Sequence, residues 1–248
     1  MTALLSATGL TKAFDGMRAV DRVDIRIPEG RVTGIIGPNG AGKTTLVHLL
    51  TGHLMPDEGR IEFAGADITC LPADARVRTH LCRTFQIVDV FKRLTVFQNV
   101  QIARITRQGR NLRFFTPAAR EDDDEIVAIL TEVGLWDRRH RPAEQLSHGE
   151  QRRLDLAVTL ATRPRLCFLD EPTAGVSPRE RDQMLELIRR LGRVRRTTFV
   201  IIEHDIEVVF GLCDWITVMN RGAILAEGPP DAIRGNREVR EVYLGEEV

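Results

Sequence analysis

A glycine-rich segment followed by a lysine and two threonines carries the most distinctive chemistry in the sequence. Residues Gly37, Pro38, Asn39, Gly40, Ala41, Gly42, Lys43 and Thr44 match the pattern G-x-x-x-x-G-K-[ST] at every fixed position, and Thr45 follows. Glycines let the backbone turn its N–H groups around phosphate oxygens, and a helix that starts there adds a positive dipole. Lys43 would place its charge on the β- and γ-phosphates, and the Thr44 hydroxyl would ligate Mg²⁺. The spacing therefore predicts a loop that binds a nucleoside triphosphate.

A pair of carboxylates at the end of an apolar run complements this loop. Leu166-Cys-Phe-Leu169 is short and continuously apolar, as expected of a strand buried on both faces. Asp170 at its end is placed to hold Mg²⁺, and Glu171 is placed to polarise an attacking water as a general base. Such a pair is a weak signal by itself. Downstream of a phosphate loop, it predicts hydrolysis of the bound nucleotide.

The elements that must position these residues alternate between strand and helix. Residues 23–27 alternate apolar and polar, residues 31–36 form an apolar run into the loop, and residues 43–51 show helical spacing. After Pro164, strand patterns recur at 166–169, 197–202 and 215–219. The pattern predicts an α/β core.

Two helical patterns carry further expectations. Residues 179–191 form a helix with Glu186 and Arg190 paired at i, i+4. Between residues 91 and 162 the periodicity is mostly helical, including a helix over 121–133 whose start holds the acidic run Asp122 to Asp124. We expect that run to be a solvated helix start, where the dipole favours negative charge.

Composition narrows the class of protein. Of the 248 residues, 35 are Lys or Arg and 35 are Asp or Glu, so the formal net charge is zero and predicts no nucleic-acid partner. The four cysteines are scattered without metal-ligand spacing, which favours reduced thiols in a cytosolic protein. Apolar runs are too short to span a bilayer, and no export signal opens the chain.

A third motif, Leu146-Ser147-His148-Gly149-Glu150-Gln151, resembles the signature motif of ATP-binding cassette (ABC) ATPases, usually written LSGGQ. It stands where that family places it, shortly before the Asp-Glu strand. Phe14, Gln86 and His204 also occupy positions that resemble the family's adenine-stacking aromatic, Q-loop glutamine and switch histidine. The resemblance covers essentially the whole chain.

The resemblance implies a role for each residue. Phe14 packs on the base, Gln86 reaches Mg²⁺ and water and couples to a transmembrane partner, and His204 contacts the γ-phosphate. Ser147 and Gly149 contact the ATP of another protomer, because cassettes dimerise head to tail around two nucleotides. The implied cofactors are ATP and Mg²⁺, with Thr44, Gln86 and Asp170 at the metal, and with Glu171, His204 and Gln86 in catalysis.

The implied fold is a P-loop NTPase (RecA-like) core with an antiparallel β subdomain and an inserted helical subdomain that carries the signature motif. We expect the first part of the ATP-binding core at 1–87, the helical subdomain at 88–162, the second part of the core at 163–230 and a C-terminal helical tail at 231–248.

Three departures from the common motifs are His148, Glu150 and Ser177, where glycine, glutamine and aspartate are usual. Together with Arg83-Thr-Phe-Gln86, Ile201-Ile-Glu-His-Asp205 and the ending Val239-Arg-Glu-Val-Tyr-Leu-Gly245, they resemble the LivG-type ATPases of branched-chain amino acid importers, whose relatives handle urea or short amides.

That resemblance implies an enzyme that converts ATP and water to ADP and phosphate and drives two transmembrane permease subunits. Further implied partners are a second cassette and, indirectly, a periplasmic solute-binding protein, with the chain peripheral on the cytoplasmic side of the inner membrane. The segments 88–97 and 107–115 would form the permease dock.

Other classes stay open at this point. The tail also resembles the ATPase of lipopolysaccharide export. Non-transport cassettes of DNA repair carry a long coiled coil between the phosphate motifs, and those of translation typically carry two cassettes; neither feature is present here. A P-loop kinase for a small metabolite would leave residues 146–151 unexplained.

Overall fold

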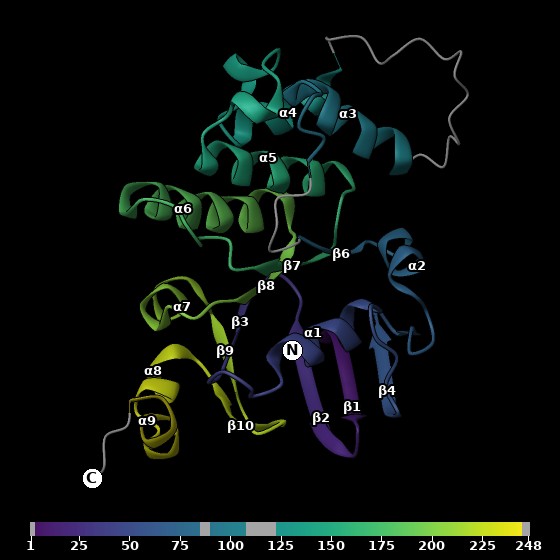
Figure 1. The fold of residues 1–248 in the computed structure, drawn as a ribbon, viewed down its shortest axis with the longest axis vertical. Coiled ribbons are helices and arrows are strands. Elements are labelled where there is room, and N and C mark those ends of the chain that lie inside the picture. The colour runs from purple at the N-terminus through teal and green to yellow at the C-terminus, as the bar shows by residue number, and fades with distance from the viewer. Residues whose placement is uncertain (1–2, 85–89, 108–122, 245–248) are drawn as a thin grey trace.

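The computed structural model describes residues 3–84, 90–107 and 123–244, and its centre is a mostly parallel sheet (Figure 1). The order of the strands is β10-β9-β3-β8-β7-β6, and only the pairing of β10 with β9 is antiparallel. The strands are β3 (Val32–Ile36), β6 (Leu81–Arg83), β7 (Leu166–Asp170), β8 (Thr198–Ile202), β9 (Trp215–Asn220) and β10 (Ala223–Gly228).

A second sheet is antiparallel. Two of its strands come before the glycine-rich loop in the sequence, and two come after it. Its order is β2-β1-β4-β5, from β1 (Ala3–Phe14), β2 (Met17–Pro28), β4 (Glu58–Phe63) and β5 (Ala66–Asp67). Ile25 and Ile27 of β2 are buried while Asp24 and Arg26 are exposed, so one face of this sheet is apolar and packs inward.

Helices cover both faces of the parallel sheet. They are α1 (Lys43–Thr51), α2 (Ala73–Arg78), α3 (Val96–Arg107), α4 (Asp124–Glu132), α5 (His148–Ala161), α6 (Pro178–Arg195), α7 (Ile206–Leu212), α8 (Pro230–Arg234) and α9 (Arg237–Leu244). Of these, α5 and α6 lie on one face, and α1 lies on the other. In the part of the chain that the structure describes, no helix combines the length and the apolar character that crossing a membrane requires.

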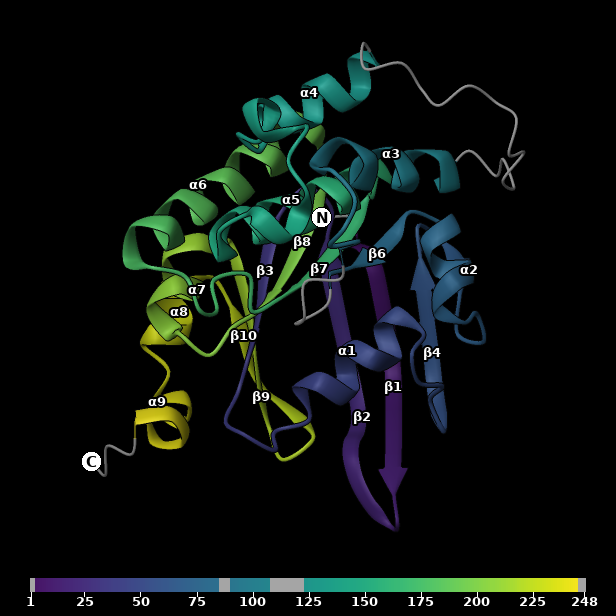
Figure 2. The ribbon, with the colours of Figure 1, turned by 45° about the horizontal axis from the view of Figure 1, so that its top comes forward.

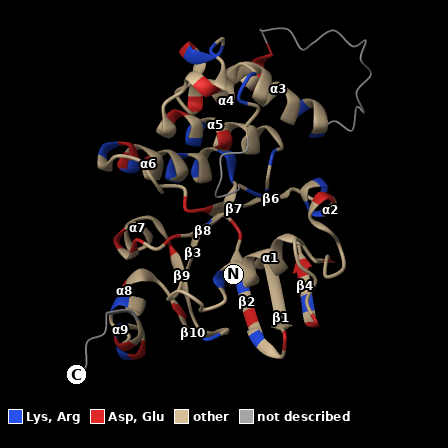
Figure 3. Ribbon diagram, viewed as in Figure 1, with Lys and Arg blue, Asp and Glu red and all other residues tan. Residues whose placement is uncertain are grey.

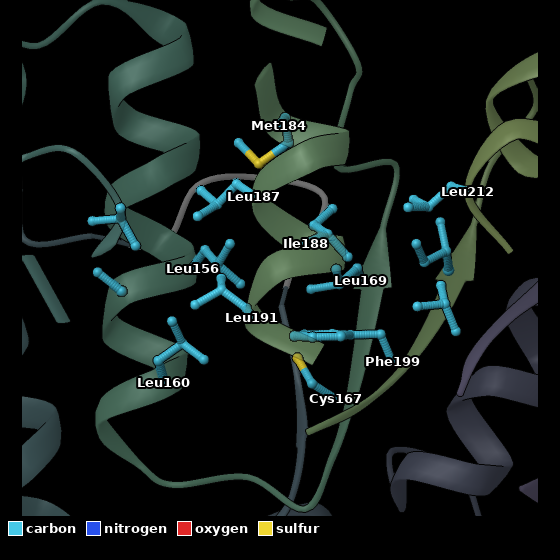
Figure 4. Close-up of a cluster of buried hydrophobic side chains, with 14 of the residues drawn as sticks. Leu156, Leu160, Cys167, Leu169, Met184, Leu187, Ile188, Leu191, Phe199 and Leu212 are labelled. Atoms are coloured by element: carbon cyan, nitrogen blue, oxygen red, sulfur yellow. The ribbon is translucent and has the colours of Figure 1, made fainter. Parts of the chain in front are cut away.

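The parallel strands are buried on both faces because alternate side chains enter two different cores. Cys167 and Leu169 of β7 face one cluster, with Phe199 of β8 and side chains of α5 and α6, as Figure 4 shows. Leu166 and Phe168 face a second cluster, formed with α1 and the antiparallel sheet. The continuous apolar run at 166–169 is therefore explained by two covered faces, as predicted.

Helices α3, α4 and α5 lie together at one end of the molecule, away from β1, β2 and β4 (Figure 2). Glu125 at the start of α4 joins them, since it accepts hydrogen bonds from Arg107 of α3 at 2.8 Å and from Arg163, beyond α5, at 2.7 Å. The bond from Arg107, aided by Arg163 and opposed by burial, lowers the pKa of Glu125 to about 2. The carboxylate is therefore charged at neutral pH and stabilises the helical group.

Two expectations about charged residues were wrong, the first of them only in part. Asp124 at the start of α4 is exposed as expected, but Asp123 is only 10% exposed and pairs with Arg104 at 2.7 Å instead of being solvated. On α6, Glu186 lies near Arg189 at 3.7 Å, so the pair is i, i+3 and not the expected pair with Arg190. Acidic and basic side chains nonetheless intermingle along α6 (Figure 3), in keeping with the zero net charge.

The strands and helices predicted around the two phosphate motifs are confirmed, and α1 has the predicted bounds. Short or mixed elements were missed: β6, β10, α2 and α7 are three to seven residues long and carry no clear periodicity. The division of the chain into four segments remains a prediction, although α3, α4 and α5 do lie between β6 and β7 in sequence.

Arg76 of α2 is a fully buried cation that holds the end of α1. Its guanidinium donates to the carbonyl oxygens of Leu49 at 2.7 Å and Leu50 at 2.8 Å, in the last turn of α1, where carbonyl oxygens lack the regular i+4 donors. It also donates to Leu71 and Thr69. Burial lowers the pKa of Arg76 to about 10, so the side chain stays charged at neutral pH and favours the negative end of the helix dipole.

We predict that Arg76→Met lowers the free energy of unfolding by about 3 kcal/mol, because it leaves several buried carbonyl oxygens without donors. Urea denaturation monitored by circular dichroism measures the change. Arg78→Met is the matched control, since Arg78 lies on the same helix but is 79% exposed, and should change stability by less than about 0.5 kcal/mol. Equal stability of the two variants would contradict the role given to Arg76.

Candidate active site

The glycine-rich loop runs from the end of β3 to the start of α1 and is closely enclosed by backbone. A Cβ on Gly37 would lie 2.3 Å from the carbonyl oxygen of Met219, and a Cβ on Gly42 would lie 2.3 Å from that of Ala19. Gly42 also has a φ of 97°, a backbone conformation that residues other than glycine rarely adopt, and it is the N-cap residue of α1. Only glycine fits these two positions, so the loop conformation follows directly from the sequence.

Lys43 is held inside this loop. Its Nζ donates to the carbonyl oxygens of Gly37 at 2.6 Å and Pro38 at 3.0 Å, and the residue is 6% exposed. Burial lowers the pKa of Lys43, an effect that the charge of Glu171 opposes. A desolvated ammonium at the centre of the loop is an attractive partner for phosphate oxygens.

The loop forms one wall of a pocket of about 920 Å³. The lining includes a majority of the residues predicted from the two phosphate motifs, together with Arg83, His48 and His53. The pocket is lined by Ala19, Asn39, Gly40, Ala41, Gly42, Lys43, Thr44, Thr45, His48, His53, Arg83, Asp170, Glu171, Ile202 and His204. The parallel sheet thus brings residues from 39–45, 170–171 and 204 to one site, at the carboxyl ends of its strands.

Glu171 and His204 face each other across the end of the sheet. His204 Nε2 lies 3.1 Å from Glu171 Oε1, and the Glu171 side chain is 20% exposed. Glu171 has a φ of 46°, an uncommon conformation for a residue other than glycine, and its N–H donates to the Ile202 carbonyl at 2.9 Å. This conformation turns the chain sharply after β7 and directs Glu171 into the pocket beside His204. A carboxylate in that position can accept a proton from water.

A buried carboxylate supports the loop that follows Glu171. Glu203 accepts hydrogen bonds from Thr173 N at 3.1 Å and Thr173 Oγ1 at 2.6 Å. The loop over residues 172–177 is thereby tied to the end of β8, next to His204. Sequence reasoning missed Glu203, because a glutamate next to the predicted histidine does not by itself show where its side chain points.

Three basic or titratable residues of the pocket were not predicted. Arg83 Nη2 donates to Asp170 Oδ2 at 2.6 Å, while His48 and His53 lie with ring centroids 5.8 Å apart. Burial, followed by the charge of Arg83, lowers the pKa of both histidines. His48 follows Thr44 by four residues on α1, and that spacing, which puts both on one helix face, was the available signal.

The pocket fits a magnesium nucleotide. Mg²⁺ in nucleotide sites is usually held by one or two protein oxygens together with phosphate oxygens. Thr44 and Asp170 line the same pocket and supply one hydroxyl and one carboxylate, beside a lysine and a helix N-terminus suited to phosphates. The residues present therefore suit both groups, and their assignment as ligands remains a prediction.

The signature segment lies outside this pocket, at the start of α5. Ser147 caps the helix by accepting from Glu150 N at 3.2 Å, and Glu150 Oε2 accepts from Ser147 N at 2.9 Å. Both Ser147 and His148 are exposed, and Gly149 is buried against Glu180 of α6, whose Oε1 would lie 2.6 Å from an added Cβ. Ser147 and Gly149 do not line the pocket of their own chain, as a contact with another protomer's ATP would require.

The three departures from the common motifs have local roles in the structure. Glu150 completes the capping box of α5, and Ser177 forms an equivalent capping box with Glu180 at the start of α6. His148 Nε2 lies 3.3 Å from the Ala174 carbonyl oxygen. The histidine ring is therefore directed to the loop over residues 172–177.

The roles predicted for Phe14 and Gln86 are not tested by the structure. Phe14 ends β1, is 44% exposed, and has Lys12 Nζ 5.9 Å from its ring centre, so its contact with adenine remains a prediction. Gln86 lies outside the described residues, as do Val88, residues 108–115 of the expected permease dock, and residues 245–248 of the expected tail.

We predict that Lys43→Ala lowers the affinity for MgATP at least about 100-fold, because the loop keeps its N–H donors but loses its buried cation. Isothermal titration calorimetry measures the affinity. Lys92→Ala, at an exposed lysine outside the pocket, should bind as the wild type does. Wild-type affinity in Lys43→Ala would remove Lys43 from the site.

Comparison with known proteins agrees with this geometry. The family described as "ABC transporter" matches residues 20–174, and the family described as "Branched-chain amino acid ATP-binding cassette transporter" matches residues 223–248. The chain is 41% identical to the high-affinity branched-chain amino acid transport ATP-binding protein BraF of Pseudomonas aeruginosa PAO1, and 38% identical to LivG of Escherichia coli K12. Each alignment covers 98% of both chains.

A solved structure of an ATP-binding cassette also matches nearly the whole of this chain. The ADP conformation of MJ1267, an ATP-binding cassette of an ABC transporter, matches with a TM-score of 0.87 at 32% identity. That match covers 99% of this chain and 100% of the other. The chain therefore belongs to the ABC transporter family, as an ATP-hydrolysing cassette coupled to transport, and it is similar to the LivG and BraF type.

Proposed function

We propose that this ATPase powers the import of branched-chain amino acids, or of a related small polar solute, through separate permease subunits. The observation that carries the proposal is the match of residues 223–248 to a family specific to branched-chain amino acid cassettes, together with near-complete coverage of BraF and LivG. The solute itself would bind to other subunits, since the pocket of this chain has the chemistry of a nucleotide site.

The residues of the pocket divide the work of hydrolysis. Lys43 and the N–H groups of residues 39–44 bind the phosphates, and Thr44 and Asp170 hold Mg²⁺, which supplies charge neutralisation at the phosphate oxygens when bound. Glu171 accepts a proton from the attacking water. His204 lies 3.1 Å from Glu171. In the proposed mechanism it would orient that carboxylate and contact the γ-phosphate.

The placement of the signature segment supports a head-to-tail dimer. The first turn of the 14-residue helix α5, which follows exposed Ser147, presents a positive dipole end to an anion outside its own chain. A second protomer, identical or a different cassette, would supply that anion as its bound ATP. We propose the same arrangement for this chain, with Ser147 and Gly149 completing the partner's nucleotide site.

Two permease subunits, and indirectly a solute-binding protein, complete the proposed assembly, in which the chain is a peripheral subunit on the cytoplasmic face of the membrane. The proposed dock includes Val90 and Phe91, which precede α3. Phe91 is 58% exposed, and its backbone is fixed by Asn99, which accepts from Phe91 N at 2.8 Å. An exposed aromatic on a fixed loop is suited to contact another protein.

We predict that the chain, purified in complex with its two permease subunits, hydrolyses ATP faster when solute-loaded binding protein is added. Leucine, isoleucine or valine should stimulate hydrolysis in proteoliposomes, whereas an acidic or basic amino acid should not. Stimulation only by an unrelated class of solute would exclude the branched-chain assignment while leaving the ATPase intact.

Cross-linking in the same complex locates the dock. After Cys70, the exposed cysteine, is replaced by serine, Phe91→Cys should form a cross-link to a permease. Glu186→Cys, on the exposed face of α6, is the matched control and should form none. Capture through residue 186 alone would place the permease on the opposite face.

We predict that Glu171→Gln slows hydrolysis by about 10²–10⁴-fold, the usual contribution of a positioned base, while ATP stays bound. The ATP-bound variant should then accumulate as a dimer in size-exclusion chromatography, whereas the wild type, turning over, remains monomeric. Hydrolysis at the wild-type rate would remove Glu171 from the mechanism.

Ser147→Arg is the control for the mode of dimerisation. Added to Glu171→Gln, it should abolish the dimer because a bulky side chain blocks the partner's phosphate site, yet it should leave ATP binding to the monomer unchanged. If the single variant stays monomeric with saturating ATP, the physiological partner is a different cassette.

A further inference from the structure

The predicted magnesium ligand Asp170 is paired with an arginine that neither phosphate motif contains. Arg83, the last residue of β6, donates from Nη2 to Asp170 Oδ2 at 2.6 Å. The two side chains are only 7% and 14% exposed, so the pair is shielded from water. Strand β6 runs parallel to β7, with Arg83 opposite Phe168. Arg83 and Asp170, the last residues of these two strands, therefore lie at the same end of the sheet.

Arg83 has donor capacity that the pair leaves unused. Its Nε is buried and has no hydrogen-bond partner among the residues that the structure describes, although a buried donor is normally satisfied. Arg83 also lines the 920 Å³ pocket together with Lys43, Thr44 and Asp170. An arginine in such a position is suited to phosphate oxygens, which accept from its planar fork of donors.

The pair and the metal compete for one carboxylate. If Asp170 is to approach Mg²⁺, directly or through a water, the oxygen now bound to Arg83 must be shared or released, and the guanidinium and the metal repel each other. A buried arginine that loses its carboxylate needs another anion. The phosphate chain of a nucleotide bound in this pocket supplies such an anion.

We propose that Arg83 is a positioning residue that holds and neutralises Asp170 while the pocket lacks Mg²⁺, and that it exchanges Asp170 for the nucleotide's phosphates when Asp170 takes up the metal. The proposal rests on the proposed nucleotide and metal site. It assigns to Arg83 a part in setting the order and the strength of nucleotide and metal binding, which the two phosphate motifs alone do not provide.

The exchange predicts effects of opposite sign in Arg83→Gln. Fluorescence of a mant-ATP probe in EDTA should show at least about tenfold weaker binding, because Asp170 then keeps an unneutralised negative charge beside the phosphates. Titration of the probe-bound protein with Mg²⁺ should show half-saturation at an about tenfold lower concentration, because Asp170 no longer has to leave Arg83. Arg83→Lys, which keeps the charge without the fork, should fall between.

Asp170→Asn gives the complementary test. It frees Arg83, so magnesium-free mant-ATP should bind more tightly than to the wild type, and adding Arg83→Gln should abolish that gain. The effect of Arg83→Gln on the Mg²⁺ titration should also be lost when Asp170 is already asparagine, as a double-mutant cycle requires of a coupled pair. Arg165→Gln, at an exposed arginine 2.7 Å from Glu29 and outside the pocket, should change neither binding curve.

The outcomes separate this proposal from the proposed function. If Arg83→Gln weakens ATP and Mg²⁺ binding alike, or leaves the Mg²⁺ titration unchanged, Arg83 has only a structural role and the exchange is excluded. If Arg83→Gln does not fold, Asp170→Asn decides: tighter binding of magnesium-free probe supports the exchange, and equal or weaker binding excludes it. Failure of the wild type to bind mant-ATP at all would instead overturn the nucleotide site itself.

Discussion

The close approach of backbone to backbone at the glycine-rich loop is the constraint on which the other parts of the site depend. Gly37 lies against the Met219 carbonyl at the end of β9, and Gly42 lies against the Ala19 carbonyl in β2. Gly222 N donates to Ala41 O and Asp21 N donates to Gly222 O, each at 2.9 Å. The parallel and antiparallel sheets therefore meet at the loop, and backbone contacts from both sheets maintain its shape.

Helix α1 transmits this constraint to the interior. At its start, the loop carbonyls of Gly37 and Pro38 hold Lys43; at its end, Arg76 binds the carbonyl oxygens of Leu49 and Leu50. A short helix fixed at both ends keeps its dipole and its first N–H groups directed at one point. The buried cation Lys43 therefore lies at the phosphate end of α1. The buried cation Arg76 lies at the opposite end, where a positive charge stabilises the helix dipole.

The sequence predicted most of the core because its signals are local. A glycine loop between a strand and a helix and a run buried on both faces follow from residue type and order, whereas the contact of Glu171 with His204 was not predicted. Partners distant in sequence did not follow: Arg83 meets Asp170 across 87 positions, and Arg163 meets Glu125 across 38. Short strands such as β6 add no periodicity, so the residues that they bring into the pocket were missed.

The three residues that depart from the common motifs, His148, Glu150 and Ser177, make contacts within their own chain. Glu150 and Ser177 each complete a capping box in their own helix, and His148 contacts the Ala174 carbonyl, so all three act within one chain. The N–H groups at the start of α5 are consequently held in a fixed direction without a glycine at position 148. At Gly149, by contrast, an added Cβ would lie 2.6 Å from Glu180 Oε1, so the Glu180 side chain that caps α6 would have to move. A substitution in the motif is therefore compatible with the proposed contact to a second protomer wherever the substituted side chain turns back to its own protomer, as those of His148 and Glu150 do.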